Sequence, residues 1–121
     1  MTIGFTGTRK GMSEAQRAQL HAVIDWLWIG RRDDREFRHG AAIGADLQAV
    51  DIASRWANAA IVAHPANGQP LARNRAIVAA SDILIAAPES DTEQLRSGTW
   101  ATVRYARRKG IPIVMLSRGE K

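Results

Sequence analysis

Three consecutive residues, Ser97-Gly98-Thr99, follow a loop and open a segment with the character of a helix. A helix that begins in this way presents unpaired backbone N–H groups and the positive end of its dipole to an anion. The glycine lets the main chain come close to a ligand, and the two hydroxyl groups can add donors. Trp100, the next residue, can either stack on a base or pack against a neighbouring helix. The run therefore predicts a site for phosphate.

Other small and polar residues stand at the ends of predicted strands. An arginine such as Arg9 or Arg73 beside a crevice is a suitable phosphate partner. Asp46 is favoured in a first helical turn by the helix dipole alone, but its charge would also suit a ribose hydroxyl. The plainer alternatives are that the glycines only serve turns and close packing, that the arginines are solvated, and that His39 and His64 are structural. The predicted ligand-binding residues are Gly7, Thr8, Arg9, Gly40, Ala41, Gly44, Asp46, Arg73, Asn74, Pro88, Ser97, Gly98, Thr99 and Trp100.

Strand-like and helix-like segments alternate along the whole chain, and these elements must position the residues above. The expected strands are residues 2–6, 37–39, 60–63, 82–87 and 111–116. The expected helices are residues 13–29, 45–57, 70–80 and 98–109, the first with a capping box at Ser13 and Gln16 and the third with Pro70 in its first turn.

This alternation predicts an α/β fold, a three-layer Rossmann-like domain with a five-stranded parallel sheet and helices on both faces. A strand order of 3-2-1-4-5 would open a crevice outside the carboxyl ends of the first and fourth strands, where ligands bind in such sheets. The loops after residues 6, 39 and 87 would meet there.

Composition sets outer limits on the function. A chain of 121 residues predicts one domain, residues 1–121. There is no cysteine and no apolar run of the length a membrane span needs, and we expect a cytoplasmic protein without a metal site, a cofactor or a membrane partner. The net charge of +5 favours anionic partners, either nucleotides or nucleic acid, without choosing between them.

The four tryptophans bear on self-association. Trp26 and Trp28 lie two residues apart and cannot share one narrow helical face, so at least one should be partly exposed. This favours a subunit contact, and we expect a homo-oligomer. Trp56 is expected in the core or at an interface.

The ordered motifs resemble those of the SLOG superfamily. They are Gly7-Thr8-Arg9, the segment HGAAIGAD at residues 39–46, Ala72-Arg73-Asn74 and Ser97-Gly98-Thr99, and they span nearly the whole chain. Members include DprA-like proteins, cytokinin-activating phosphoribohydrolases of the LOG type and small single-domain proteins. The last group is the most similar. The resemblance implies a Rossmann-like sheet and a site for a nucleotide or a nucleotide-derived ligand.

The resemblance leaves catalysis open. The phosphoribohydrolase members carry Gly-Gly-x-Gly-Thr-x-x-Glu, whose glutamate is catalytic, whereas here Leu95-Arg96 replaces the glycine pair and Thr102 the glutamate. A hydroxyl cannot replace a carboxylate in acid–base work, although Glu89, Asp91 or Glu93 is near enough in sequence to substitute. We therefore expect a sensor or carrier module for a nucleotide, with no catalytic residue assigned. The alternatives are hydrolysis of a nucleoside 5′-monophosphate at its glycosidic bond and DprA-like binding of DNA.

Overall fold

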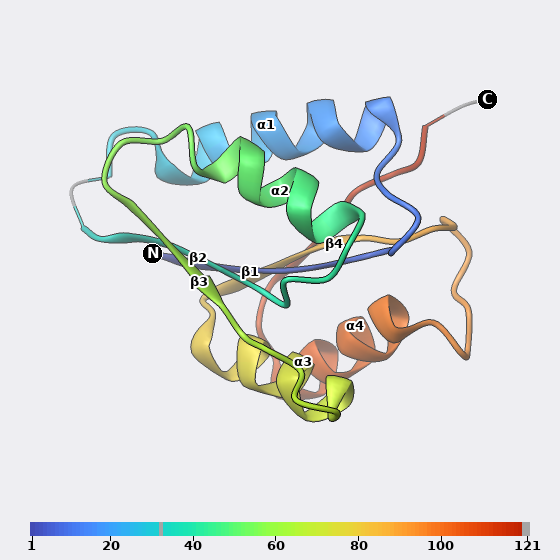
Figure 1. Cartoon of the computed structure of the whole chain (residues 1–121). Coiled ribbons are helices and arrows are strands. Elements are labelled where there is room, and N and C mark those ends of the chain that lie inside the picture. Colours follow the sequence, from blue (N-terminus) through green and yellow to red (C-terminus); the bar gives the residue numbers. More distant parts are fainter. Residues whose placement is uncertain (32, 120–121) are drawn as a thin grey trace.

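The computed structural model describes residues 1–31 and 33–119 and has a five-stranded sheet at its centre (Figure 1). The strands are β1 (Thr2–Gly7), β2 (Arg35–His39), β3 (Ala59–Ala63), β4 (Ile83–Ala87) and β5 (Ile113–Met115). All neighbouring pairs are parallel, and the order is β3-β2-β1-β4-β5. The predicted fold class and strand order are therefore confirmed.

Two helices cover each face of the sheet. Helices α1 (Glu14–Trp28) and α2 (Ala45–Ala53) lie on one face, and α3 (Pro70–Ala80) and α4 (Gly98–Lys109) lie on the other (Figure 1). Every crossover connects parallel strands through a helix, as parallel pairing requires. The order reverses beside β1, whose two neighbours are β2 and β4. The carboxyl ends of β1 and β4 thus form a switch point, paired in register from Ile3 with Ile83 to Gly7 with Ala87.

Local sequence explains where α1 and α4 begin and end. The Ser13 hydroxyl accepts a hydrogen bond from Gln16 N at 3.1 Å, and Ser13 N donates to Gln16 Oε1 at 3.0 Å, so the predicted capping box is present. The Gln16 side chain is fully buried and also donates to the carbonyl oxygens of Pro88 and Leu116, which ties α1 to the loop after β4. Gly110 ends α4 in the left-handed conformation.

Three elements have a boundary that differs by two residues or more from the prediction, and the other boundaries agree within one residue. Helix α2 ends at Ala53 rather than at residue 57, because the chain turns through residues 54–58, with Asn58 at a φ of 64°, to enter β3. Strand β2 begins two residues early, at Arg35. Strand β5 is confined to Ile113–Met115, since the N–H of Ile111 still bonds the carbonyl of Ala106 at the end of α4.

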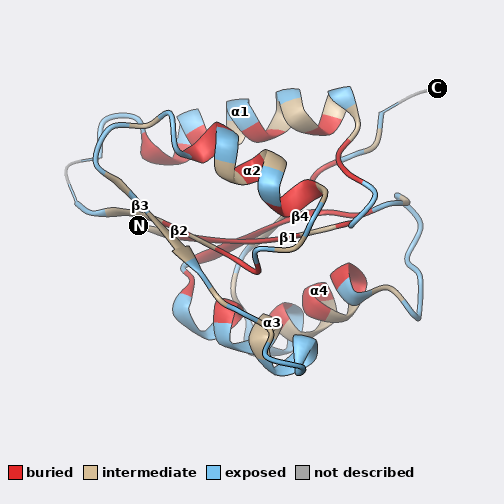
Figure 2. Ribbon diagram, viewed as in Figure 1, coloured by how far each residue is buried: buried red, intermediate tan, exposed pale blue. Residues whose placement is uncertain are grey.

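The larger part of the core lies between the sheet and the α1–α2 layer (Figure 2). Phe5 and Phe37 stack on neighbouring strands with their ring centroids 5.9 Å apart. Trp28 is fully buried and meets the half-buried Trp56 edge to face, whereas Trp26 is 79% exposed. The prediction that at least one of Trp26 and Trp28 would be partly exposed is confirmed.

In the part of the chain that the structure describes, none of the helices combines the length and the hydrophobicity that a bilayer crossing requires.

Candidate functional site

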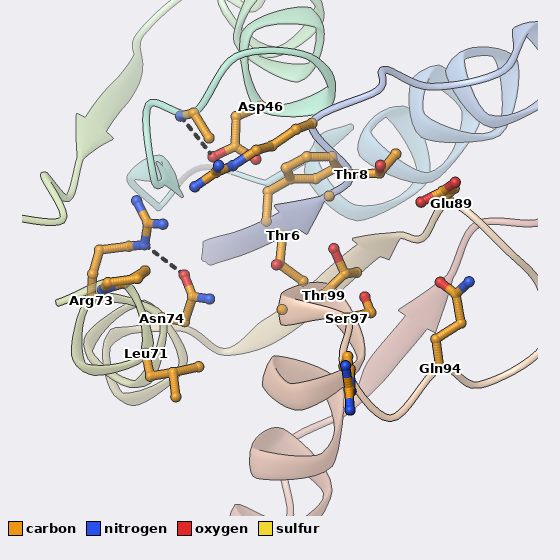
Figure 3. Close-up of a pocket in the computed structure, with 17 residues that line it drawn as sticks. Thr6, Thr8, Asp46, Leu71, Arg73, Asn74, Glu89, Gln94, Ser97 and Thr99 are labelled. Atoms are coloured by element: carbon orange, nitrogen blue, oxygen red, sulfur yellow. Dashed lines mark hydrogen bonds between the residues drawn. The ribbon is translucent and has the colours of Figure 1, made fainter. Parts of the chain in front are cut away.

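A cavity of about 500 Å³ opens at the switch point, beyond the carboxyl ends of β1 and β4 (Figure 3). Segments that are far apart in sequence supply its walls: the end of β1, the loop before α2, the start of α3 and the loop that leads into α4. The lining residues are Phe5, Thr6, Gly7, Thr8, Arg9, Ala42, Asp46, Pro70, Leu71, Arg73, Asn74, Glu89, Gln94, Arg96, Ser97, Gly98 and Thr99. Its volume falls within the range of sites for small organic ligands.

The first turn of α4 forms one wall. Ser97 caps the helix, because its hydroxyl accepts a hydrogen bond from Trp100 N at 3.2 Å, and its carbonyl accepts one from Ala101 N. Within the described part of the chain, the N–H groups of Gly98 and Thr99 have no hydrogen-bond partner. Two backbone donors at the positive end of a helix are therefore available to an anion in the cavity.

Gly98 is the glycine in this wall, and the fold itself does not require it. A Cβ atom built at this position meets no other atom within 4 Å, and its φ lies outside the left-handed region. By contrast, a Cβ on Gly44 would overlap the backbone of Arg9, at a φ of 86°. Neither packing nor backbone conformation therefore explains Gly98, which lines the cavity.

Cationic side chains surround the same cavity. Arg9 and Arg96 are exposed, and among the described residues neither forms an ion pair. Arg73 is half-buried and lies on the opposite wall from Thr99 (Figure 3). Two carboxylates also line the cavity, those of Asp46 and Glu89. Glu89 is paired with Lys10 at 2.8 Å. The balance of charge around the cavity is therefore positive.

The loop of residues 40–42 is held from two sides. Asp46 Oδ2 accepts hydrogen bonds from Gly40 N at 2.8 Å and from Ala42 N at 3.4 Å. Arg73 Nη1 donates to the carbonyl oxygen of Gly40 at 2.6 Å, and its Nε donates to Asn74 Oδ1 at 2.6 Å. The loop is thereby fixed before any ligand arrives, and Ala41 is held at a φ of 57°.

Burial sets the ionisation of the groups under this loop. It raises the pKa of Asp46, an effect that the two N–H donors and the charge of Arg73 oppose. Burial, followed by the charges of His64 and Arg73, lowers the pKa of His39. His39 is buried, and its Nδ1 accepts from Ala41 N at 2.9 Å, which requires that nitrogen to be unprotonated.

Nine of the fourteen predicted ligand-binding residues line the cavity: Gly7, Thr8, Arg9, Asp46, Arg73, Asn74, Ser97, Gly98 and Thr99. The other five, which do not line it, are Gly40, Ala41, Gly44, Pro88 and Trp100.

Four of these five residues have a structural place instead. A Cβ on Gly40 would overlap the guanidinium of Arg73, so the missing side chain leaves room for the hydrogen bond from Arg73 to the Gly40 carbonyl. Gly44 lies against the backbone of Arg9. Pro88 uses its carbonyl to hold Gln16. Trp100 is 5% exposed and packs with Val103 of its own helix and with Ala86 of β4, so it is a packing residue, although it packs on the sheet and not against a neighbouring helix.

The structure also adds lining residues that sequence reasoning left out. The additional residues are Phe5, Thr6, Ala42, Pro70, Leu71, Glu89, Gln94 and Arg96. Thr6 could have been predicted, since it is a polar residue near the end of an otherwise apolar central strand. Arg96 could also have been predicted, because it directly precedes the serine that opens the helix. Nothing in the sequence around Leu71 indicates that it lines the cavity.

The carboxylates near the cavity are not equivalent. Asp91 bonds Ser117 and Arg118, and Glu93 pairs with Arg104 at 2.8 Å, so both are engaged elsewhere. Glu89 alone of the three acidic residues on this loop lines the cavity. Thr102 is buried, and its hydroxyl donates to the carbonyl of Gly98 at 2.9 Å, within its own helix.

Within the described residues, no three His, Asp or Glu side chains gather in a way that would hold a metal ion. The arrangement is instead suited to an organic anion, since it offers backbone donors, arginines, an amide and one apolar wall. No protein-family model and no curated protein matches this sequence.

Proposed function

We propose that this chain binds a nucleoside 5′-phosphate, or a derivative of one, in the cavity between β1 and β4. We further propose that it is a small single-domain member of the SLOG superfamily that serves as a sensor or carrier of this ligand. One observation carries the proposal: the N–H groups of Gly98 and Thr99, which have no partner among the described residues, share one cavity with Arg9, Arg73 and Arg96.

The parts of the cavity suit the parts of a nucleotide. The phosphate would lie on the first turn of α4, with Arg9 and Arg96 contributing charge. Asp46 uses Oδ2 for the loop, and its remaining oxygen can accept from a ribose hydroxyl. Leu71, 55% exposed on the rim, offers an apolar surface to the base.

Thermal shift and titration calorimetry with a panel of nucleotides test this function. A ligand present at about 100 times its dissociation constant adds about 2.7 kcal/mol to the free energy of unfolding. We expect nucleoside 5′-monophosphates to raise the melting temperature and the corresponding nucleosides to have a much smaller effect. A folded sample that responds to no nucleotide would contradict the proposal.

Two double variants distinguish an effect at the cavity from a general effect of lost positive charge. The double variant Arg9→Gln/Arg96→Gln should weaken monophosphate binding at least tenfold, because two charge-assisted contacts are lost. The double variant Arg31→Gln/Arg55→Gln removes the same charge from exposed positions that do not line the cavity, and it should bind as the unmodified chain does.

Hydrolysis of the glycosidic bond is the second candidate, and the position of Glu89 favours it. This carboxylate lines the cavity, whereas Thr102, at the position of the family's catalytic glutamate, does not. Release of free base from a nucleoside monophosphate, abolished by Glu89→Gln, would establish the enzyme. Binding without release would establish the carrier.

A further inference from the structure

A second hollow, of about 200 Å³, lies between α3 and α4 next to the main cavity. Leu71 and Asn74 line both spaces, so the two are neighbours across a shared rim. Figure 3 shows both side chains on the α3 wall of the main cavity. A ligand that occupies the main cavity can therefore extend over this rim along α4.

The second hollow is strongly cationic and has one aromatic ring. Arg75, Arg104, Arg108 and Tyr105 line it. The guanidinium carbons of Arg75 and Arg108 lie 5.2 Å and 5.7 Å from the centre of the Tyr105 ring, and Lys109 Nζ lies 5.5 Å from it. Three cationic side chains thus surround one tyrosine ring, and Arg104 lines the same hollow.

The fold accounts for only part of this charge. Arg108 and Lys109 are in the last turn of α4, where the helix dipole favours cations. That reason does not apply to Arg75, in the middle of α3, or to Arg104, in the middle of α4. Among the described residues, Glu93 is the carboxylate that pairs with this group, and it reaches Arg104 and not Arg75 or Arg108. The mutual repulsion of the remaining charges would be relieved by an anion.

The spacing along α4 limits the kind of anion. With a rise of about 1.5 Å per residue, Arg104 and Arg108 lie about 9 Å and about 15 Å along the helix from Gly98. The adjacent phosphates of a nucleoside diphosphate share one oxygen atom and cannot span such a distance. Two phosphates separated by a nucleoside lie further apart, and the side chains of Arg104 and Arg108 shorten the remaining distance because they reach back toward the start of α4, to Leu95 O and to the Tyr105 ring.

Asn74 on the shared rim is oriented to contact the connecting part of such a ligand. Its Oδ1 accepts from Arg73 Nε at 2.6 Å, so its amide nitrogen is the atom left to donate. Leu71 beside it is exposed and apolar. The rim therefore offers one donor and one apolar surface between two sites that favour phosphate.

We propose that the hollow between α3 and α4 is a second phosphate subsite, and that the ligand is a linear dinucleotide with a 5′-phosphate. The inference rests on the proposed function. The 5′-phosphate occupies the first turn of α4, and the internucleotide phosphate lies against Arg75, Arg104 and Arg108. The second base is placed to stack near Tyr105.

Calorimetric titration of the full chain with related ligands tests the subsite. The ligands are a nucleoside 5′-monophosphate, the matching 5′-diphosphate, the 5′-phosphorylated dinucleotide and oligonucleotides of increasing length. We expect the dinucleotide to bind at least tenfold more tightly than the monophosphate and the diphosphate to gain little. The variant Arg75→Gln/Arg108→Gln should remove the dinucleotide's advantage and leave monophosphate affinity within about twofold. The charge-matched Arg31→Gln/Arg55→Gln variant should keep the advantage.

The possible outcomes distinguish this inference from the function on which it rests. If no nucleotide binds, the proposed function fails and the subsite fails with it. If the monophosphate binds and the dinucleotide gains nothing, the subsite alone is refuted. It is also refuted if Arg75→Gln/Arg108→Gln weakens both ligands equally. An affinity that grows steadily with oligonucleotide length and falls steeply with salt would replace the dinucleotide with a nucleic acid strand.

Discussion

Replacing Gly98 with alanine should separate folding from binding. The added methyl group meets no other atom within 4 Å and needs no unusual φ, so the folded chain has room for it. Because glycine is less favourable than alanine in a helix by about 0.5–1 kcal/mol, stability should stay the same or rise slightly. For a domain of this size, the melting temperature should rise by no more than about 4 °C.

The same methyl group should weaken a phosphorylated ligand considerably. It would stand beside the unpaired N–H groups of Gly98 and Thr99, in the space proposed for the phosphate. Loss of one charge-assisted hydrogen bond costs about 1.5–3 kcal/mol, which corresponds to a ten- to hundredfold weaker affinity. Gly98→Leu should weaken binding further, since its side chain fills more of the cavity.

Thermal denaturation and calorimetry on the same samples check both halves of this prediction. The control is a nucleoside without phosphate, whose weak binding should be little changed by Gly98→Ala. Unchanged monophosphate affinity in Gly98→Leu would show that the phosphate does not lie on α4. A marked loss of stability in Gly98→Ala would show that the glycine serves the fold.

Three further predictions concern the loop before α2. Gly44→Ala should lower the free energy of unfolding by at least about 2 kcal/mol in chemical denaturation, because its φ is 86° and the new methyl group overlaps the backbone of Arg9. Arg73→Ala should lower the free energy of unfolding by about 1–3 kcal/mol in the same assay, because its hydrogen bonds to the loop are lost. An unchanged midpoint would contradict the role of Arg73 in holding the loop. The pKa of His39 lies below 6.5 in the fold, so the unfolded chain takes up the proton first and stability should fall as the pH drops from about 7 through 6.5 towards that lowered pKa. His39→Asn should flatten this part of the stability profile, and a slope that His39→Asn leaves unchanged would assign it to other groups.

Much of the fold follows from local patterns in the sequence. The Ser13 capping box, Pro70 in the first turn of α3 and Ser97 before α4 are local signals, and each marks the beginning of a helix that the structure contains. The strand order followed from the rules for parallel connections rather than from any single residue. Element ends were less predictable, since the turn after α2 depends on how the chain reaches β3.

The candidate site was also predictable from the sequence only in part. The sequence by itself determined that Gly98 opens a helix beyond the carboxyl end of β4, beside the loop that follows β1. This followed because a parallel sheet brings the carboxyl ends of its strands to one edge. The resulting positions of Arg9, Arg73 and Thr99 around one cavity agree with that expectation.

Only the tertiary structure decided which side chains face the cavity. Thr99 and Trp100 are neighbours in sequence, yet a turn of about 100° per residue sends one to the cavity and the other into the core. Gly40 and Gly44 support the loop rather than line the cavity, because contacts with Arg73 and Arg9 from distant segments occupy the adjacent space. The direction of a side chain depends on helix rotation and on packing between remote segments, and a single sequence encodes neither of these locally.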